Sequence, residues 1–380
     1  MKILLTGGGT GGHLYPLLAV ADEIKKLKGI KTEILFIGPV NNFSKKILTD
    51  NGIKTQGILT AKWRRYWSFE NLLDIFKFPL GLIQSLIYVL SFMPDVVFSK
   101  GGYGSVAPTL AARLYWIPVL IHESDVLPGR ANAWMGKLAD RIAVSFESSK
   151  KYFNIRKVLV TGNPVRANIR EGNIEKAREF FGLRPQKPVL LIMGGSQGSQ
   201  IINERILRIL PLLLESYQII HQVGKDNLAK VKEIAGRQGI KIGRSDYHPY
   251  EFLGNEIIHA YKICDLVISR AGAGSIIEIA AVKKPSILIP LRKSASGHQL
   301  HNAYAVAKKG GTVIVEEANL RDRLLLTKID NIMEDMKLRE KMSRAIAQFY
   351  YPDAAEKITK SLIYLGKVGA VKGKGFFEKE

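Results

Sequence analysis

The chain has 380 residues, enough for two domains of ordinary size, and its 46% hydrophobic content excludes disorder over most of its length. Its 56 Lys and Arg against 34 Asp and Glu give a formal charge of +22. That charge favours anionic partners such as nucleic acid, an anionic membrane face or a phosphorylated small molecule, although excess lysine also serves solubility alone. The single cysteine, Cys264, excludes an intrachain disulfide and a cysteine metal site. The N-terminus begins directly with a strand-like run, so we expect no signal peptide.

Short apolar runs separated by helical patterns open the chain and predict buried strands. They are KILLT (2–6), TEILFI (32–37), DVVFS (95–99), PVLIH (118–122) and RIAVS (141–145). A sixth run, KVLVT (157–161), is followed by a Gly-Asn-Pro break at 162–164. The rhythm restarts with PVLLIMGG (188–195), YQIIHQVG (217–224), DLVISRAG (265–272), PSILIP (285–290) and GTVIVEE (311–317). Alternating strands and helices predict parallel sheets covered by helices on both faces.

Two such series with a proline-containing joint predict an α/β protein of two doubly wound, Rossmann-like domains that face each other across a cleft. We expect an N-terminal domain at 1–164 and a C-terminal domain at 165–348. A last helix is expected at 349–366, returning to the N-terminal domain, with a loose tail at 367–380.

Residues 62–95 combine basic and aromatic residues with a long apolar stretch. The uncharged part, 78–93, contains a proline and a glycine and is shorter than the roughly 20 apolar residues of a membrane-spanning helix. It fits a helix buried in the domain or a surface that rests on an anionic membrane, and one helix can do both through its two faces. The residues expected at the membrane surface are Trp63, Arg64, Arg65, Trp67, Phe76, Leu80 and Ile83.

Glycine-rich loops follow four of the predicted strands, at 7–13, 100–105, 194–200 and 270–275. Ligands of open α/β sheets bind at the carboxyl ends of strands, where glycine lets backbone N–H groups approach an anion and the helix dipole adds to the attraction. One such loop indicates little, because tight strand-to-helix turns need glycine anyway. Two in each domain predict a site that holds phosphate groups from both sides.

The first loop matches the dinucleotide-binding pattern G-x-G-x-x-G at residues 7–12. A dehydrogenase also needs an acidic residue at the end of the second strand, to bind the ribose 2′-hydroxyl. Here that strand ends in Gly38 and Pro39, and Glu33 lies at its opposite end. The pattern therefore disfavours an NAD-dependent dehydrogenase.

A serine hydrolase and a nucleic-acid-binding protein are two further hypotheses. Residues 194–198 match the nucleophile elbow G-x-S-x-G, and Asp265 and His298 follow in the order of a catalytic triad. Asp265 precedes its strand, however, so it would lie at the opposite edge of the sheet from Ser196. The basic residues are spread through helices without a recognised nucleic-acid-binding module, so we expect no specific nucleic-acid partner.

Sugar transfer explains more of the pattern. A nucleotide-sugar donor carries one diphosphate and a lipid-linked acceptor carries another, which matches glycine loops in both domains. The chain has no D-x-D stretch, so we expect no metal and no cofactor at the donor diphosphate. Helix N-termini together with Arg166 and Arg270 would stabilise the leaving UDP.

A set of motifs in fixed order makes the chain similar to a known family. They are GGGTGGHLYPLLAVADEI, GGYGS, HES, TGNPVR, GGSQGS, RAGAGSIIEIA and HQLHNA. With them the chain resembles, from Lys2 to about Ile363, the MurG family of N-acetylglucosaminyltransferases (glycosyltransferase family 28). The resemblance implies the two-domain GT-B fold and an inverting transfer from UDP-GlcNAc to the C4 hydroxyl of the muramyl sugar of lipid I, which gives lipid II for peptidoglycan synthesis.

The resemblance also implies where the partners bind. The N-terminal domain would bind lipid I and rest on the cytoplasmic face of the bacterial cell membrane as a peripheral protein. The C-terminal domain would bind UDP-GlcNAc. The acceptor diphosphate would lie against the first two glycine loops, at Gly9, Gly101, Gly102 and Tyr103.

The donor set implied by the resemblance draws on both domains. Arg270, Ser196 and the helix start at 273–275 would contact the donor phosphates, and Arg166 would lie near the donor at the joint. The full set is Thr10, Gly11, Gly12, Asp125, Arg166, Ser196, Gln197, Leu253, Arg270, Ala273, Gly274, Ser275, Glu278 and Gln299.

Four residues of the C-terminal domain would bind the remaining parts of the donor or support its loops. Glu278 would hold the ribose hydroxyls, unless it is only an exposed helix carboxylate. Leu253 would offer backbone groups to uracil. Gln299 would bind sugar hydroxyls, with Asn302 supporting its loop.

Two residues are candidates for the general base. His13 lies at a helix N-terminus, which lowers the pKa of an imidazole and keeps it neutral and able to accept the proton of the acceptor hydroxyl. Equally, His13 can cap the loop or bind a phosphate. Glu123 is the second candidate, as base or as orienting group.

Two departures from the family pattern concern the sugar contacts. The family usually has HEQN where this chain has HESD, so Asp125 replaces an amide by a charge. Gly297 replaces an acidic or amide residue before His298. Other GT-B enzymes with lipid acceptors, such as diacylglycerol galactosyltransferases, share the same loops, so the acceptor rests on the resemblance.

Overall fold

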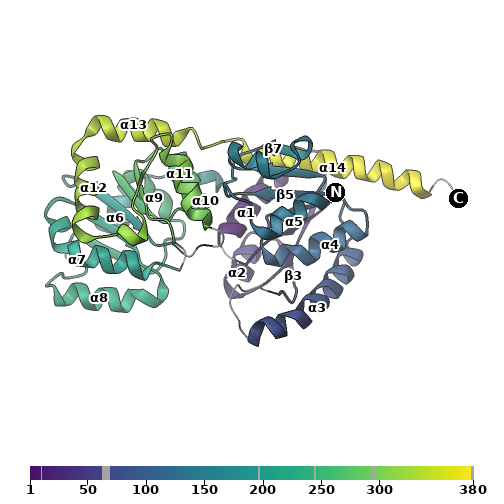
Figure 1. Cartoon of the computed structure of the whole chain (residues 1–380), viewed down its shortest axis with the longest axis horizontal. Helices are drawn as coiled ribbons and strands as arrows, with labels where there is room; N and C mark the ends of the chain where they lie inside the picture. Colours follow the sequence, from purple (N-terminus) through teal and green to yellow (C-terminus); the bar gives the residue numbers. More distant parts are fainter. Residues whose placement is uncertain are drawn as a thin grey trace. The chain divides into compact units, whose positions relative to one another are not determined.

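The computed structural model describes residues 1–9, 11–61, 69–195, 197–243, 245–292, 294 and 297–377, without the side chains of 69–76 and 369–377. The chain forms two compact units, residues 1–166 with 351–380 and residues 167–350 (Figure 1). Each unit is a parallel sheet covered by helices, which confirms the predicted fold class.

The first unit is built on a seven-stranded sheet of order β3-β2-β1-β4-β5-β6-β7. Its strands are β1 (Lys2–Thr6), β2 (Glu33–Gly38), β3 (Lys54–Gly57), β4 (Val96–Ser99), β5 (Val119–Glu123), β6 (Arg141–Val144) and β7 (Val158–Val160). Its helices are α1 (Gly11–Lys25), α2 (Asn42–Asp50), α3 (Phe69–Phe92), α4 (Val106–Leu114), α5 (Arg130–Leu138) and α14 (Ala354–Phe377), with 3-10 turns η1 (Tyr103–Ser105), η2 (Glu147–Tyr152) and η3 (Ile155–Lys157).

The strands are buried on both faces because alternate residues feed two separate cores. Leu5 and Phe98 pack with α1 and α14 on one face, whereas Leu4 and Val97 pack with α3, α4 and α5 on the other. Residues that pair across parallel strands therefore lie on the same face of the sheet. The same alternation tells on which face a residue just after a strand lies.

The second unit has a six-stranded sheet of order β10-β9-β8-β11-β12-β13. Its strands are β8 (Val189–Met193), β9 (Gln218–Gln222), β10 (Tyr247–Tyr250), β11 (Leu266–Ser269), β12 (Ser286–Leu288) and β13 (Val313–Ile314). Its helices are α6 (Ile174–Phe181), α7 (Gln200–Ser216), α8 (Leu228–Arg237), α9 (Ile257–Ile263), α10 (Ala273–Val282), α11 (His298–Ala307), α12 (Asp322–Glu334) and α13 (Met336–Ala347), with 3-10 turns η4 (Ala167–Arg170), η5 (Lys225–Asn227) and η7 (Glu317–Asn319).

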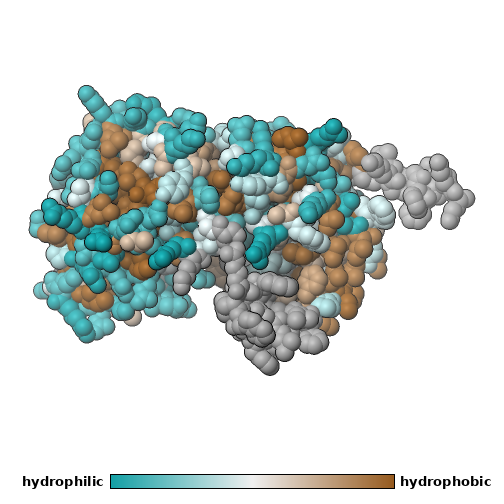
Figure 2. All heavy atoms as spheres, viewed as in Figure 1, coloured by the Kyte–Doolittle hydropathy of each residue, from teal (hydrophilic) through white to brown (hydrophobic). Residues whose placement is uncertain are grey.

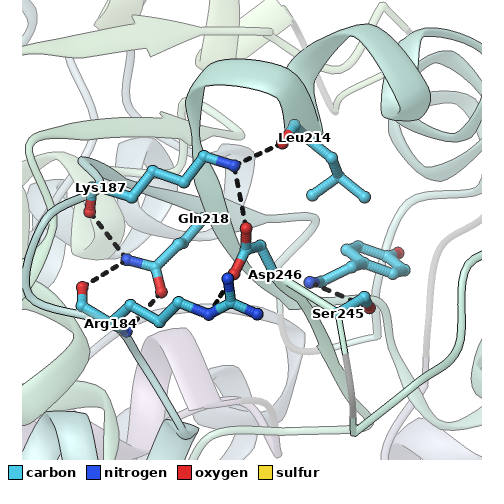
Figure 3. Close-up of polar contacts among 7 residues, drawn as sticks. Arg184, Lys187, Leu214, Gln218, Ser245 and Asp246 are labelled. Atoms are coloured by element: carbon cyan, nitrogen blue, oxygen red, sulfur yellow. Dashed lines mark hydrogen bonds and ion pairs between the residues drawn. The ribbon is translucent and has the colours of Figure 1, made fainter.

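The amino edge of this second sheet is closed by a polar cluster with mutual partners (Figure 3). Gln218 donates to the carbonyl oxygens of Arg184 and Lys187, both at 2.8 Å. Asp246 accepts from the Lys187 ammonium at 2.9 Å and lies 3.5 Å from the Arg184 guanidinium. These charges are paired and serve the packing of the edge that lies opposite the glycine loops.

Three features differ from the sequence-based expectations. Strands β3 and β10 have no apolar run, because each lies at the edge of its sheet; β10 even contains Pro249, which an edge strand tolerates. The tail expected to be loose from residue 367 instead continues α14 to Phe377. That helix packs on α1 and β4 of the first unit.

Candidate functional site

Three loops meet at the carboxyl edge of the first sheet, after β1, β4 and β5. The β1 and β4 loops are adjacent, because the Lys100 N–H donates to the carbonyl of Thr6 at 2.8 Å. The β1 loop leads into α1 at Gly11 and the β4 loop into η1 at Tyr103, whose side chain is largely exposed. The carbonyl of Gly9 accepts a hydrogen bond from Asn41 at 3.4 Å. The two predicted acceptor loops thus lie side by side.

His13 stands in the first turn of α1 with its imidazole between two glycines of these loops. A Cβ built at Gly8 would lie 2.8 Å from Nδ1, and one built at Gly102 would lie 3.0 Å from Nε2. Burial, and secondarily the charge of Lys100, lowers the pKa of His13 to about 4. The imidazole is therefore neutral at pH 7, as a proton acceptor must be.

Lys100, which follows β4, is a charged residue of this edge that the sequence patterns did not reveal. The residue is 2% exposed, and its Cβ lies 3.3 Å from the position of a Cβ at Gly7. Burial lowers the pKa of Lys100 to about 8, and the charges of Glu123 and Asp125 oppose that lowering. A buried lysine on the sheet face that carries α1 places positive charge beneath the start of that helix.

Glu123 ends β5, and both its carboxylate oxygens hold the loop that follows. Oε1 accepts from the N–H of Asp125 at 2.8 Å, and Oε2 accepts from the N–H of Gly129 at 3.0 Å and from Asn132 Nδ2 at 2.9 Å. Burial raises the pKa of Glu123, with a further contribution from the charge of Asp125, while these hydrogen bonds oppose the rise. The arrangement suits an orienting group that fixes Asp125.

His122 and Arg166 connect the joint segment to this edge. Nε2 of the buried His122 donates to the carbonyl of Gly162 at 3.0 Å, since a carbonyl can only accept. Burial holds the pKa of His122 well below its usual range. The Arg166 guanidinium lies over the ring of Tyr15 in α1, 4.4 Å from its centroid. Arg166 is thereby held close to the helix that carries His13.

The second unit carries the corresponding loops after β8, β11 and β12. Helix α10 follows Gly272, and no side chain caps its N-terminus. A Cβ built at Gly272 or Gly274 would meet no described atom within 4 Å, so the first turn of α10 is open to a ligand. The predicted phosphate contacts at Ala273, Gly274 and Ser275 form this turn. Gln197 is exposed on the β8 loop.

Arg270, predicted to contact the donor phosphates, has several partners within the second unit. Its guanidinium is buried and donates to Ser199 Oγ at 2.6 Å and to the carbonyl of Ile289 at 3.1 Å. It also forms an ion pair of 2.6 Å with Glu317, whose other oxygen accepts from the N–H of Arg292 at 2.9 Å. Arg270 therefore joins the β8, β12 and η7 segments, and its predicted contact with a donor phosphate stays a prediction.

Gln222 and Gln299 organise the remaining donor loops. Gln222 donates to the carbonyl of Gly195 at 2.9 Å and accepts from the N–H of Leu253 at 3.0 Å. The N–H of Leu253 is thus bonded within the protein, and its carbonyl is the backbone group left for the predicted contact with uracil. Gln299 accepts from the N–H of Leu291 at 3.0 Å. Asn302 donates to the carbonyl of Ala271 at 3.3 Å, which ties α11 to the α10 loop.

Glu278 lies one turn into α10. Its Oε2 accepts a hydrogen bond from the Tyr261 hydroxyl at 3.2 Å, which fixes the orientation of the carboxylate. Tyr261 itself is buried in α9, so the contact holds Glu278 against the body of the unit. The carboxylate is therefore a positioned group beyond the open first turn of α10, as a ligand for ribose hydroxyls requires.

An exposed apolar stripe runs along α3 (Figure 2). Leu80, Ile83, Ile87 and Leu90 have helical spacing and each exposes more than half of its surface. The opposite face of α3 packs on the core, which confirms the buried interpretation for that face and leaves the membrane contact of the exposed face a prediction. Helix α4 contacts α3, and the turn after it carries Trp116, which is 86% exposed. No helix among the described residues is long and apolar enough to cross a membrane.

Several predicted residues lie outside the described part of the chain. They are Thr10, Ser196, Trp63, Arg64, Arg65 and Trp67; Phe76 lies in α3, but its side chain is not described. The groups that sequence reasoning missed are Lys100, Asn132, Ser199, Gln222 and Glu317. The sequence did contain a signal for Lys100, because SKGGYGS at 99–105 resembles SRAGAGS at 269–275 and places Lys100 at the position of Arg270.

Comparison with known proteins gives a consistent result over both units. The family models for the glycosyltransferase family 28 N-terminal and C-terminal domains match residues 3–144 and 189–358. The UDP-N-acetylglucosamine–N-acetylmuramyl-(pentapeptide) pyrophosphoryl-undecaprenol N-acetylglucosamine transferase of Clostridium botulinum is 40% identical over 88% of this chain and 91% of its own. The enzyme of the same name from Clostridium perfringens is 39% identical over 87% and 90%.

Solved structures show how widely the fold is shared. The crystal structure of Acinetobacter baumannii MurG superposes with a TM-score of 0.73 at 24% identity, over 96% of this chain and 99% of that one. The UDP-GlcNAc 2-epimerase of Neisseria meningitidis, bound to UDP-GlcNAc, gives a TM-score of 0.69 at 18% identity over 96% and 100%. Because transferases and epimerases share the architecture, the fold alone does not select the reaction.

Proposed function

The chain belongs to glycosyltransferase family 28, and we propose that it transfers N-acetylglucosamine from UDP-GlcNAc to the C4 hydroxyl of the muramyl sugar of lipid I, giving lipid II. The observation that carries this proposal is the 40% identity, over 88% of the chain, to an enzyme named for that transfer. The local geometry supplies a neutral histidine and an uncapped helix N-terminus, two groups that such a transfer uses.

The donor is assigned to the second unit. The open first turn of α10 presents backbone N–H groups at the positive end of the helix dipole, where a diphosphate is stabilised without a metal. Glu278, oriented by Tyr261, would accept hydrogen bonds from the ribose hydroxyls. Arg270 would act through Ser199, the N-cap of α7, by holding the β8 loop in place.

The acceptor is assigned to the first unit, where His13 is the base. The C4 oxygen of the muramyl sugar attacks C1 of N-acetylglucosamine as the bond from C1 to the phosphate oxygen breaks. The electron pair leaves with UDP, and the hydroxyl proton passes to the neutral imidazole. Attack opposite the leaving group inverts the configuration at C1. Glu123 is assigned as the group that orients Asp125, because its oxygens already accept three hydrogen bonds.

The α3 stripe and Trp116 are assigned to the membrane face on which a lipid-linked acceptor is presented. The net charge of +22 adds attraction to anionic lipid. A variant carrying Ile83→Ser and Trp116→Ser should sediment less with anionic vesicles. Leu212→Ser, which changes an exposed apolar side chain of α7 in the second unit, is the control and should leave sedimentation unchanged. Equal loss in both variants would remove the assignment.

A turnover assay tests the transfer itself. The protein is incubated with radiolabelled UDP-GlcNAc and micelles containing either lipid I or diacylglycerol, with UDP-glucose and UDP-galactose as competing donors. We expect labelled lipid II from UDP-GlcNAc and lipid I alone, with a β linkage by NMR. Transfer to diacylglycerol instead would assign another lipid glycosyltransferase, and no transfer with any pair would refute the proposal.

A further inference from the structure

The two units repeat one segment at equivalent positions of their sheets. SKGGYGS (99–105) follows β4, which pairs with the first strand β1, and SRAGAGS (269–275) follows β11, which pairs with the first strand β8. The Lys100 N–H donates to the last residue of β1, and the Arg270 N–H donates to the last residue of β8 at 3.3 Å. Lys100 and Arg270 are therefore counterparts. Each is a buried cation directly after the strand, β4 or β11, that pairs with the first strand of its sheet.

The two cations differ in what neutralises them. Arg270 has a carboxylate at 2.6 Å, a hydroxyl and a carbonyl as partners. Lys100 has none of these: among the residues that the structure describes, no group accepts a hydrogen bond from its ammonium and no carboxylate lies within 4 Å of it. Only its backbone N–H is bonded. Lys100 is 2% exposed, and a largely buried cation without an ion-pair partner is destabilising, so it indicates a ligand that completes the site.

The groups around Lys100 define what that ligand is. His13 faces it from α1, His122 and Glu123 from β5, and Asp125 from the loop after β5. Both histidines are neutral, and the Glu123 oxygens are committed to the 125–129 loop. The nearby N-terminus of α1, a helix of 15 residues that opens with two glycines, adds a positive dipole end. The chemistry that fits is a phosphate group.

We propose that the ammonium of Lys100 binds a phosphate oxygen of the acceptor's diphosphate, beside the N-terminus of α1, and so fixes the acceptor next to His13. This inference rests on the proposed function, because it takes lipid I as the source of the diphosphate. Arg270, in contrast, is already paired with Glu317 inside the second unit.

Steady-state kinetics of Lys100→Met test the role. Methionine keeps the length of the buried side chain and removes the charge. We expect the KM for lipid I to rise about 10- to 100-fold, the loss of one charge-assisted hydrogen bond, while the KM for UDP-GlcNAc stays within about twofold. Lys46→Met, at an exposed lysine of α2, should change neither. An unchanged KM for lipid I in an active, folded Lys100→Met protein would overturn the inference.

Binding of inorganic pyrophosphate separates this inference from the proposed function. Calorimetry on the free protein should show a site that Lys100→Met weakens at least about tenfold and Lys46→Met leaves intact. If the wild-type protein transfers no sugar but this site is present, the function fails and the phosphate site stands. If transfer occurs and pyrophosphate binds both proteins equally, the inference fails and the function stands.

The pH dependence gives a readout that a structural role would not move. The pKa of Lys100 lies at about 8, so raising the pH from 7 to 9 should neutralise the ammonium and raise the KM for lipid I. In Lys100→Arg, which stays charged, this rise should disappear while binding is retained. An identical pH profile in both proteins would contradict the assignment.

Discussion

The carboxyl edges of the two sheets carry similar turns, each with a buried cation. In one unit that cation is paired with a carboxylate, and in the other it is not. In the second unit Arg270 is paired with Glu317 and bonded to Ser199, so the edge is a finished scaffold that presents an open helix N-terminus. In the first unit Lys100 is buried without a partner in the described chain, beside the neutral His13. A paired cation organises a loop, whereas an unpaired one is available to a substrate.

The amino edge of the second sheet gives the reference case. There Asp246 pairs with both Lys187 and Arg184, so each cation of that cluster has a carboxylate partner within the unit (Figure 3). Arg270 resembles this cluster more than it resembles Lys100. Burial and charge alone therefore do not identify a binding group; the presence or absence of an internal partner does.

The largest expected effect comes from His13, which places the chemistry at the edge of the first sheet. His13→Ala should lower kcat about 10²- to 10⁴-fold, because the hydroxyl loses its proton acceptor. Binding of UDP-GlcNAc, assigned to the other sheet, should stay unchanged in calorimetry. A normal kcat would return the base assignment to Glu123.

The next largest expected effects are on the free energy of unfolding, and they should differ between variants that affect Arg270 and Lys100. Glu317→Ala leaves Arg270 charged and buried, and should cost about 3–5 kcal/mol in the unfolding of the second unit. Lys100→Met should not lower the free energy of unfolding. The lowering of the Lys100 pKa from 10.5 to about 8 means that the charged ammonium destabilises the folded state by about 3 kcal/mol, and methionine removes that charge. Denaturant unfolding measures both, and a destabilised Lys100→Met would reveal a hidden partner.

A pair of glycine variants isolates the contact around His13. Gly102 and Gly52 both have positive φ, of 83° and 67°, so alanine costs each about 1–2 kcal/mol of backbone strain. Only at Gly102 would the new methyl group press on the imidazole; at Gly52 it meets nothing. Gly102→Ala should lower kcat about 100-fold and Gly52→Ala should not. Equal activities would show that the position of His13 is immaterial.

The smallest expected effect is the loss of folding stability at acidic pH. Because the pKa of His13 is about 4 in the folded protein and 6.5 in the unfolded chain, the unfolded chain takes up the proton first as pH falls. His13 therefore contributes stability above pH 6.5 that is lost progressively between pH 6.5 and 4. The kcat should stay level from pH 7 to about 5, measured by initial rates. An acidic limb near pH 6.5 would exclude this imidazole as the base.

Much of the fold followed from local patterns, because buried parallel strands are continuous apolar runs. Every run predicted as a strand contains one, and the predicted fold class and family resemblance are confirmed. Strands β3 and β10 escaped prediction, since edge strands bury little and their sequences KTQG and YHPY carry no apolar signal. The continuation of α14 beyond residue 367 was likewise not apparent from its glycine-rich sequence.

The sequence by itself determined where the loops, helices and candidate side chains occur, because glycine spacing and hydrophobic period act over a few neighbouring residues. Tertiary structure alone decided which charges are neutralised internally. Arg270 forms an ion pair with Glu317, 47 positions away along the sequence, whereas no carboxylate of the described chain lies within ion-pair distance of the Lys100 ammonium, although both residues follow a strand in nearly identical segments. The partner of a buried charge comes from distant elements, so a motif predicts the presence of a cation but not its availability.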